Sequence, residues 1–136
     1  MGQVNKITGK RDGKGKMQWK NNDVFEGIWR NNNPNGLGRM IYADGSVYEG
    51  NWTDGKQDGH GVFKSLDKMK YVGCFKEGFQ HGKGEETWPD GSTYTGEFIN
   101  GKKTGKGKFK WADGSSYKGS LLDNKLSGYG KYRWVQ

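Results

Sequence analysis

The stretch Tyr94–Asp113 reads Y-T-G-E-F-I-N-G-K-K-T-G-K-G-K-F-K-W-A-D, and the chain repeats its pattern from end to end. An aromatic residue opens the stretch, with a glycine two residues later and a second aromatic two residues after that. Asn-Gly follows, then a G-x-G pair, two more aromatics and an Asp-Gly step. The same order returns every 23 residues, and a fixed period of this length indicates a repeat architecture.

The repeat keeps its register from one copy to the next. Its opening aromatic slot holds Phe25, Tyr48, Tyr71, Tyr94 and Tyr117. The glycine slot after it holds Gly27, Gly50, Gly73, Gly96 and Gly119. The last aromatic slot holds Tyr42, Ser65, Trp88, Trp111 and Trp134. We therefore interpret residues 1–136 as one array, made of a partial repeat at 2–24, full repeats at 25–47, 48–70, 71–93 and 94–116, and a truncated repeat at 117–136.

Each repeat is predicted to be a β-hairpin. Aromatic or glycine residues alternate with polar ones at a period of two, which is typical of strands. The first turn centres on pairs such as Asn100-Gly101, whose second residue is always Gly or Asn, as a two-residue type I′ turn requires. The second turn reads Pro89-Asp90-Gly91 or a variant, which fits a three-residue loop closed by a glycine bulge.

Loops of two and three residues leave two strands of about nine residues in each repeat. The antiparallel pairs that we predict are Tyr71 with Gly84, Gly73 with Gly82 and Tyr94 with Glu86. The predicted fold class is all-β: an elongated, single-layer antiparallel meander of about 12 strands without helices of note. It should advance about 10 Å per repeat and reach about 55 Å in length.

The two faces of this sheet differ. Face A carries the aromatic and glycine slots, and face B carries the residues between them. Because a glycine has no side chain, a ring from the neighbouring strand can lie flat over its backbone and bury apolar area without a second layer. Each repeat then covers its neighbour, as in other solenoids, and no conventional core is expected.

Composition narrows the class of protein. The 136 residues fit one domain, and the net charge of +8 favours acidic partners such as anionic lipid, an acidic protein surface or nucleic acid. No apolar run approaches the roughly 20 residues of a membrane span, and the polar N-terminus carries no secretory signal. A single cysteine, Cys74, suits a reducing compartment. These features predict a cytoplasmic location.

The pattern Y-x-G-x-W/F, then G-x-G, then D-G, at a period of 23, resembles the MORN (membrane occupation and recognition nexus) repeat over residues 2–136. Members of this family form elongated β-hairpin arrays and act as binding or scaffold modules. Some lie beside lipid kinase or SET methyltransferase domains, and others in junctional membrane proteins or cytoskeletal assemblies. The resemblance implies partner binding through an aromatic, grooved face and a role in phospholipid binding. It also admits a membrane or cytoskeletal association, or a role as the regulatory N-terminal part of a larger lipid kinase or SET-type enzyme.

Face A is the main candidate site, for binding a protein partner. No second layer covers its aromatic stripe, and apolar patches with Tyr and Trp anchors are typical of interaction sites. The predicted partner-binding residues are Tyr48, Trp52, Tyr71, Phe75, Trp88, Tyr94, Phe98 and Trp111. We expect neighbouring repeats to cover most of each ring and the remainder to face a partner helix or extended peptide. The alternative is that the rings serve only to stack the repeats.

Face B is the second candidate site, for attraction to an anionic phospholipid such as a phosphoinositide. Its basic residues are densest at Lys106, Lys108 and Lys110, and each basic residue near an anionic membrane contributes about 1 kcal/mol. The alternative is a solvated face on which glutamates such as Glu97 pair with lysines across strands. Nucleic acid binding is not predicted, because lysines and aromatics lie on opposite faces and single-strand binding needs both in one groove.

No catalytic residue, metal site or cofactor is predicted. His60 and His81 stand 21 residues apart without a ligand spacing. The G-x-G pairs lie within strands and no helix follows them, so they are not phosphate loops. Cys74 has no histidine opposite it. The chain is therefore predicted to be a non-catalytic scaffold or targeting module.

Three departures from the repeat fall in the middle of the array. Ser65 replaces an aromatic, Glu86 enters face A, and Asp67-Lys68 replaces Asp-Gly. They are either drift at tolerant positions or a polar contact within a binding groove. At the two ends, the terminal strands are expected to be open edges, which permits end-to-end association of two copies.

Overall fold

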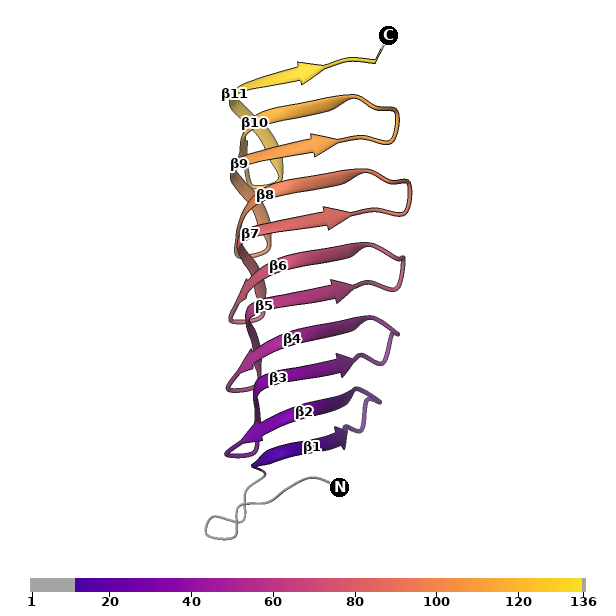
Figure 1. Ribbon diagram of the computed structural model, residues 1–136, viewed down its shortest axis with the longest axis vertical. Coiled ribbons are helices and arrows are strands. Elements are labelled where there is room, and N and C mark those ends of the chain that lie inside the picture. The colour runs from indigo at the N-terminus through magenta and orange to yellow at the C-terminus, as the bar shows by residue number, and fades with distance from the viewer. Residues whose placement is uncertain (1–11, 136) are drawn as a thin grey trace.

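The computed structural model describes residues 12–135 and places them in one sheet of eleven antiparallel strands (Figure 1). The strands are β1 (Gly13–Gln18), β2 (Val24–Arg30), β3 (Asn33–Ile41), β4 (Val47–Thr53), β5 (Lys56–Lys64), β6 (Lys70–Lys76), β7 (Phe79–Thr87), β8 (Thr93–Ile99), β9 (Lys102–Lys110), β10 (Ser116–Leu122) and β11 (Lys125–Arg133). They lie in chain order, so each pairs only with its neighbours in sequence. The predicted all-β, single-layer meander is confirmed, and no helix occurs within residues 12–135. The twelfth predicted strand belongs to the start of the partial repeat at 2–24, and that start falls outside the described residues.

Both predicted turn types are present. The Asn100-Gly101 turn has φ values of 50° and 82°, and positive φ at both central residues is what type I′ requires. The three-residue loops close on a residue with positive φ, for example Gly91 at 90°. Lys68 takes this position at 70°, and its N–H donates to Ser65 O at 3.0 Å, as in the glycine loops. The Asp67-Lys68 departure therefore leaves the loop unchanged in shape.

Strand pairing within each hairpin differs from the prediction. The observed pairs are Tyr71 with Glu86, Gly73 with Gly84 and Tyr94 with Glu86. The third pair is as predicted, whereas the first two lie two residues away from the predicted partners Gly84 and Gly82. The cause is a β-bulge beside Gly73, which makes the two strands of the hairpin seven and nine residues long. Side chains change face at every residue along a strand. An insertion of two residues therefore leaves each later side chain on its original face.

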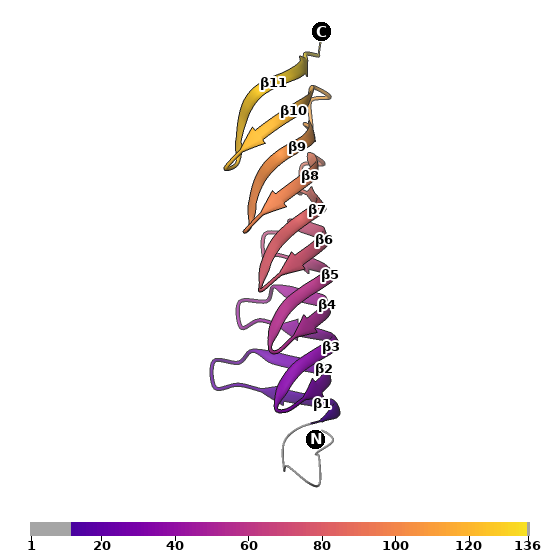
Figure 2. The ribbon, with the colours of Figure 1, turned by 90° about the vertical axis from the view of Figure 1, so that its left-hand side faces the viewer.

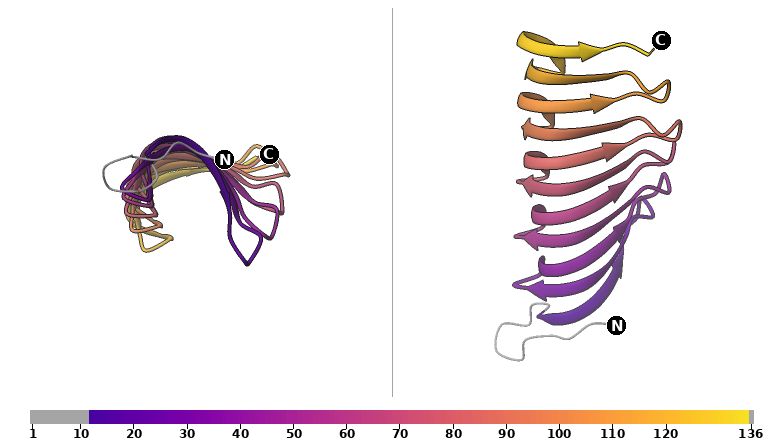
Figure 3. Two further views of the ribbon diagram at one scale, coloured as in Figure 1. Left: turned by 90° about the horizontal axis from the view of Figure 1, so that it is seen from below. Right: turned by 45° about the horizontal axis from the view of Figure 1, so that its top comes forward.

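The sheet is bent into a half-pipe. Both ends of every hairpin turn to the same side, which gives a U-shaped cross-section when the array is viewed along its length (Figures 2 and 3). The paired glycines and the bulge beside them allow the backbone to bend sharply. Face A lies inside the U, where the rings of Tyr48 and Trp52, four residues apart on β4, have centroids only 5.1 Å apart.

The hollow of the half-pipe contains a core. Ten side chains along it are buried: Phe25, Trp29, Tyr48, Trp52, Tyr71, Phe75, Tyr94, Phe98, Tyr117 and Leu121. From Trp29 to Tyr94 their rings meet edge to face, with centroids 4.8 to 5.3 Å apart. The expectation that the array has no conventional core is therefore wrong, because bending gives a single sheet two facing walls that can enclose side chains.

Candidate functional site

The residues predicted to bind a partner fall into two groups. Six of the eight are at most 7% exposed: Tyr48, Trp52, Tyr71, Phe75, Tyr94 and Phe98. Trp88 and Trp111 are only partly buried and pack on the outside of the core. The six buried rings hold the repeats together, so a partner on face A would contact Trp88, Trp111 and the residues around them.

The open surface of the hollow has two walls that repeat with every hairpin. The aromatic wall carries Tyr42, Trp88 and Trp111, and the polar wall carries Gln57, Gln80 and Lys103. We call the surface between them the groove. Contacts cross it, since the Gln57 amide donates to Tyr42 Oη at 2.7 Å and Lys103 Nζ lies 5.4 Å from the centre of the Trp88 ring. The polar wall was missed in the sequence because its partners stand 15 residues away, in the preceding hairpin.

An ion pair lies on the floor of the groove. Lys103 Nζ is 2.5 Å from Glu86 Oε1, and the two side chains are only 15% and 7% exposed. The same ammonium lies within 5.6 Å of the ring centres of Trp88, Tyr94 and Phe98. A buried carboxylate is costly unless it is paired, and Lys103 supplies the compensating charge. Glu86 thus enters face A as half of an internal polar contact.

A pocket opens beside the loop in which Ser65 replaces the aromatic residue of its repeat, although Ser65 itself does not line it. Its lining includes Gln57, Phe63, Met69, Phe75, Gln80 and Glu86. Met69 connects the two, because its backbone N–H donates to Ser65 Oγ at 3.1 Å. The aromatic wall is therefore interrupted between Tyr42 and Trp88 by a pocket with mostly apolar sides.

The phenol groups of Tyr42 and Tyr94 on face A stay neutral. Burial, together with the nearby Asp23 carboxylate, raises the pKa of Tyr42 to about 12. Burial likewise raises the pKa of Tyr94 to about 12, and its hydroxyl donates to Glu97 O at 3.0 Å. Tyr42 Oη is therefore a polar group of the groove that keeps its proton at neutral pH.

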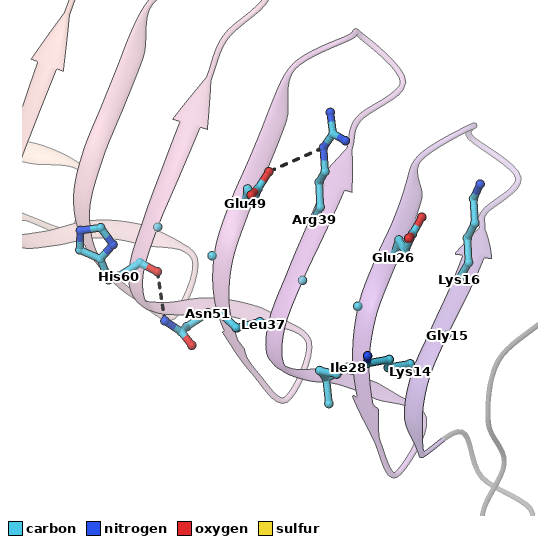
Figure 4. Close-up of a pocket in the computed structure, with 14 residues that line it drawn as sticks. Lys14, Gly15, Lys16, Glu26, Ile28, Leu37, Arg39, Glu49, Asn51 and His60 are labelled. Carbon is cyan, nitrogen blue, oxygen red and sulfur yellow. Dashed lines mark hydrogen bonds and ion pairs between the residues drawn. The ribbon is translucent and has the colours of Figure 1, made fainter.

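Face B is the outside of the half-pipe, and its charges are sorted along the array. One row of directly paired residues crosses all eleven strands: Lys16, Glu26, Arg39, Glu49, Val62, Val72, Glu85, Thr95, Lys108, Lys118 and Lys131. Charges alternate at the N-terminal end, where Arg39 Nε lies 3.9 Å from Glu49 Oε2 (Figure 4). At the C-terminal end the row has three lysines in succession.

We call Lys108, Lys118 and Lys131 the lysine ladder. They lie directly opposite one another on β9, β10 and β11, and no ion pair joins them to a carboxylate within the described part of the chain. Lys106 and Tyr129 stand beside the ladder, over glycine backbone, and the Tyr129 side chain is 94% exposed. An aromatic ring therefore shares face B with lysines here, so the expected separation of the two residue types by face is incomplete.

The three residues predicted to bind lipid are not equivalent. Lys108 belongs to the ladder, and Lys110 is exposed on β9 opposite Ser116. Lys106 Nζ donates to Ser120 Oγ at 2.8 Å, and the Lys106 N–H donates to Glu97 Oε2 at 2.7 Å. The alignment of Lys118 with Lys108 was missed because it depends on strand register, which the repeat pattern alone does not give.

A metal site, a membrane-spanning helix and a free thiol are the other features that bear on function. Among residues 12–135, no group of three or more His, Cys, Asp or Glu side chains is placed to hold a metal ion. In the same part of the chain, no helix has the length and apolar character needed to cross a membrane. Cys74 is exposed as a free thiol and lies directly opposite His60 on β5, so the expectation that no histidine stands opposite it is wrong.

Comparison with solved structures identifies proteins with a similar sheet. The TCP domain of SAS-4 (dCPAP) of Drosophila melanogaster, solved in complex with a proline-rich motif of Ana2 (dSTIL), aligns with a TM-score of 0.58 at 14% identity, over 91% of this chain and 68% of that chain. The TCP10 domain of Danio rerio CPAP aligns with a TM-score of 0.42 at 14% identity, over 83% of this chain and 68% of that one. The first likeness shows a shared fold.

Comparison by sequence gives the family. No curated protein matches the chain. The family model for the MORN repeat matches residues 9–24, 25–47, 48–67, 71–93, 94–116 and 117–136. The 23-residue hairpins, their glycine pairs and their buried aromatic row are thus those of a protein that belongs to the MORN repeat family.

Proposed function

We propose that this protein is a non-catalytic interaction module that binds an extended segment of a partner protein in the groove. The observation that carries the proposal is the row of partly open rings of Tyr42, Trp88 and Trp111, which rises from a fully buried core. Tyr and Trp are the residues that most often anchor partners, because they offer a large contact area with few rotatable bonds. The Drosophila TCP domain, which shares the sheet fold, is in complex with a proline-rich motif.

The groove is organised before a partner arrives. Trp111 stacks on Phe109 with centroids 5.3 Å apart and planes 7° apart, and Trp111 in turn stacks with Tyr132. Rings held in this way lose little conformational freedom on binding, so more of the contact energy remains as affinity. On the polar wall, the Gln57 amide, which already donates one N–H to Tyr42 Oη, is the donor offered to the carbonyl groups of an extended segment.

The experiment is an affinity capture of partners on the folded protein, repeated with Trp88→Ala and Trp111→Ala. Tyr129→Ala is the matched control, because it removes an aromatic ring from the opposite face, where the residue is 94% exposed. Partners of the groove should be lost from both Trp variants and kept by the control, with unchanged circular dichroism spectra. Partners that survive both Trp changes would place the interaction elsewhere.

A second candidate function is docking on an anionic membrane through the lysine ladder. Like charges directly opposite each other across strands are destabilising, and no carboxylate within the described residues offsets the three lysines. Each basic residue near an anionic bilayer contributes about 1 kcal/mol, so the ladder with Lys106 and Lys110 would give weak, salt-sensitive binding. Such a module would act in the cytoplasm, alone or as the regulatory part of a larger enzyme.

Sedimentation with vesicles tests this second candidate. The protein should bind vesicles that contain phosphatidylserine at low salt and dissociate from them at high salt. It should not bind vesicles of phosphatidylcholine alone. Lys118→Glu should lower the bound fraction several-fold by breaking the ladder at its centre. Absence of binding at low salt, or equal binding by Lys118→Glu, rules out docking by the ladder.

A further inference from the structure

We infer that the groove takes a polyproline II segment laid along the length of the array, with every third residue of the segment facing one repeat. This inference rests on the proposed function and specifies the conformation, direction and spacing of the partner segment. It starts from the fact that the positions of both walls recur once per hairpin, with rings at Tyr42, Trp88 and Trp111 and a gap at Ser65 on one wall, and Gln57, Gln80 and Lys103 on the other.

The spacing of the walls selects the conformation. Two strands at ~4.8 Å each advance the groove by about 9.6 Å per repeat. A polyproline II helix rises about 9.3 Å in its three-residue turn, so a ligand side chain stays within ~0.3 Å of register at each step. An α-helix returns to the same face after seven residues, at about 10.5 Å, and drifts by ~0.9 Å per repeat. An extended strand places side chains on one face every ~6.7 Å, so it cannot present an equivalent side chain to every repeat.

The chemistry of the two walls agrees with the spacing. Polyproline II has no internal hydrogen bonds, so its carbonyl groups need donors, whereas those of an α-helix are already satisfied. The amides of Gln57 and Gln80 line the polar wall in two successive repeats, followed by Lys103, whose ammonium pairs with Glu86, and by Leu126. Proline rings pack on flat aromatic faces, which the other wall presents at the same interval.

The pocket beside the Ser65 loop fixes the register of the ligand. At the Tyr42, Trp88 and Trp111 steps a ligand residue meets a ring, whereas at the Ser65 step it meets a pocket with Phe63 and Met69 in its lining. A proline is too short to fill that space, and a larger apolar side chain such as leucine is suited to it. The ligand pattern is therefore proline, leucine, proline and proline at four positions spaced three residues apart, with small polar residues between them.

The test measures binding of fluorescein-labelled peptides to the full chain by fluorescence polarisation. One peptide carries the inferred pattern, and a second has the same composition with its prolines and leucine every fourth residue. The first should bind about tenfold more tightly than the second. Trp111→Ala should weaken it about tenfold, as expected for a hot-spot ring, and Tyr129→Ala should leave it unchanged. Ser65→Trp should remove the preference for leucine over alanine at the pocket step.

Equal affinity for the two peptides, or no binding of the first, overturns the inference. The proposed function is judged separately by the captured partners. If Trp111→Ala loses those partners and the period-three peptide does not compete with them, the groove is the site and its ligand is not polyproline II. If neither the partners nor the peptide respond to Trp111→Ala, both proposals are wrong.

Discussion

Single glycines decide whether the core can form. A β carbon added at Gly84 would lie 2.3 Å from Tyr71 Oη and 2.5 Å from the ring carbon Cζ, so the ring occupies the place of the missing side chain. Gly91 is a glycine for another reason. Nothing lies within 4 Å of a β carbon added there, but its φ is 90°. An alanine at Gly84 would therefore clash with a ring, whereas an alanine at Gly91 would only strain the backbone.

Gly84→Ala should lower the free energy of unfolding by about 3 kcal/mol or more, because neither the ring nor the paired backbone can move aside. Gly91→Ala should cost about 1 kcal/mol, the strain of one alanine in the left-handed region. Urea unfolding followed by Trp fluorescence compares the two variants. Equal losses would mean that the ring over Gly84 has room to shift.

The contribution of the Glu86–Lys103 pair to stability can be tested by replacing it with the apolar residues that occupy the same two positions in the next repeat. Glu86→Gln keeps the shape of the side chain and leaves the Lys103 ammonium without its carboxylate, which should cost about 3 kcal/mol. One repeat later the same two slots hold Phe109 and Leu126. The double variant Glu86→Phe with Lys103→Leu should therefore unfold within about 1 kcal/mol of the parent protein, since apolar replacement of a whole buried pair is close to neutral. A double variant as unstable as Glu86→Gln would show that the pair is needed for the fold.

At the scale of strands and turns, the sequence predicted the hairpins better than their curvature. Turn residues such as Asn100-Gly101 require a particular backbone conformation, so both turn types could be predicted locally. The bulge beside Gly73 adds two residues, which leaves the alternation of faces intact and therefore leaves no trace in the periodicity. The bend that follows from the bulge and the glycines buries six of the eight rings predicted to bind a partner. The two walls of the groove could not be predicted because they meet only in the bent sheet.

Strand register also makes the lysine ladder testable by stability. Lys118→Glu replaces two repulsive cross-strand pairs, with Lys108 and Lys131, by two attractive ones. It should raise the free energy of unfolding by about 1 kcal/mol at low salt, and less at high salt. Lys83→Glu is the control, and it should lower the free energy of unfolding, because it replaces the lysine opposite Glu97 by a second carboxylate. A loss of stability in Lys118→Glu would mean that a group other than the two lysines controls this site.

Over the whole molecule, the repeated loops make stability sensitive to acid. In four of the three-residue loops a hydroxyl or backbone N–H of a neighbouring serine lowers the pKa of an aspartate below its usual 3.8, at Asp44, Asp67, Asp90 and Asp113. A lowered carboxylate pKa stabilises the folded state above the unfolded-state value and loses that effect as the pH falls through the folded value. The melting temperature should therefore drop below about pH 4. A variant with all four aspartates changed to asparagine should show a flatter profile, and an unchanged profile would contradict the assignment.

Because strands pair only with their neighbours in sequence and the ring contacts reach only the next hairpin, a local defect should have a local effect. In a globular domain that unfolds as one unit, destabilisation by Gly84→Ala would speed amide hydrogen exchange equally in all strands whose exchange requires global unfolding. In this array, exchange should rise most in β6 and β7, which hold Tyr71 and Gly84, and the increase should diminish towards β1 on one side and β11 on the other. Hydrogen exchange followed by mass spectrometry resolves the strands well enough to compare the two patterns. A uniform increase would mean that the aromatic row couples all eleven strands into a single cooperative unit, and a partner bound at one end of the groove would then stabilise the other end as well.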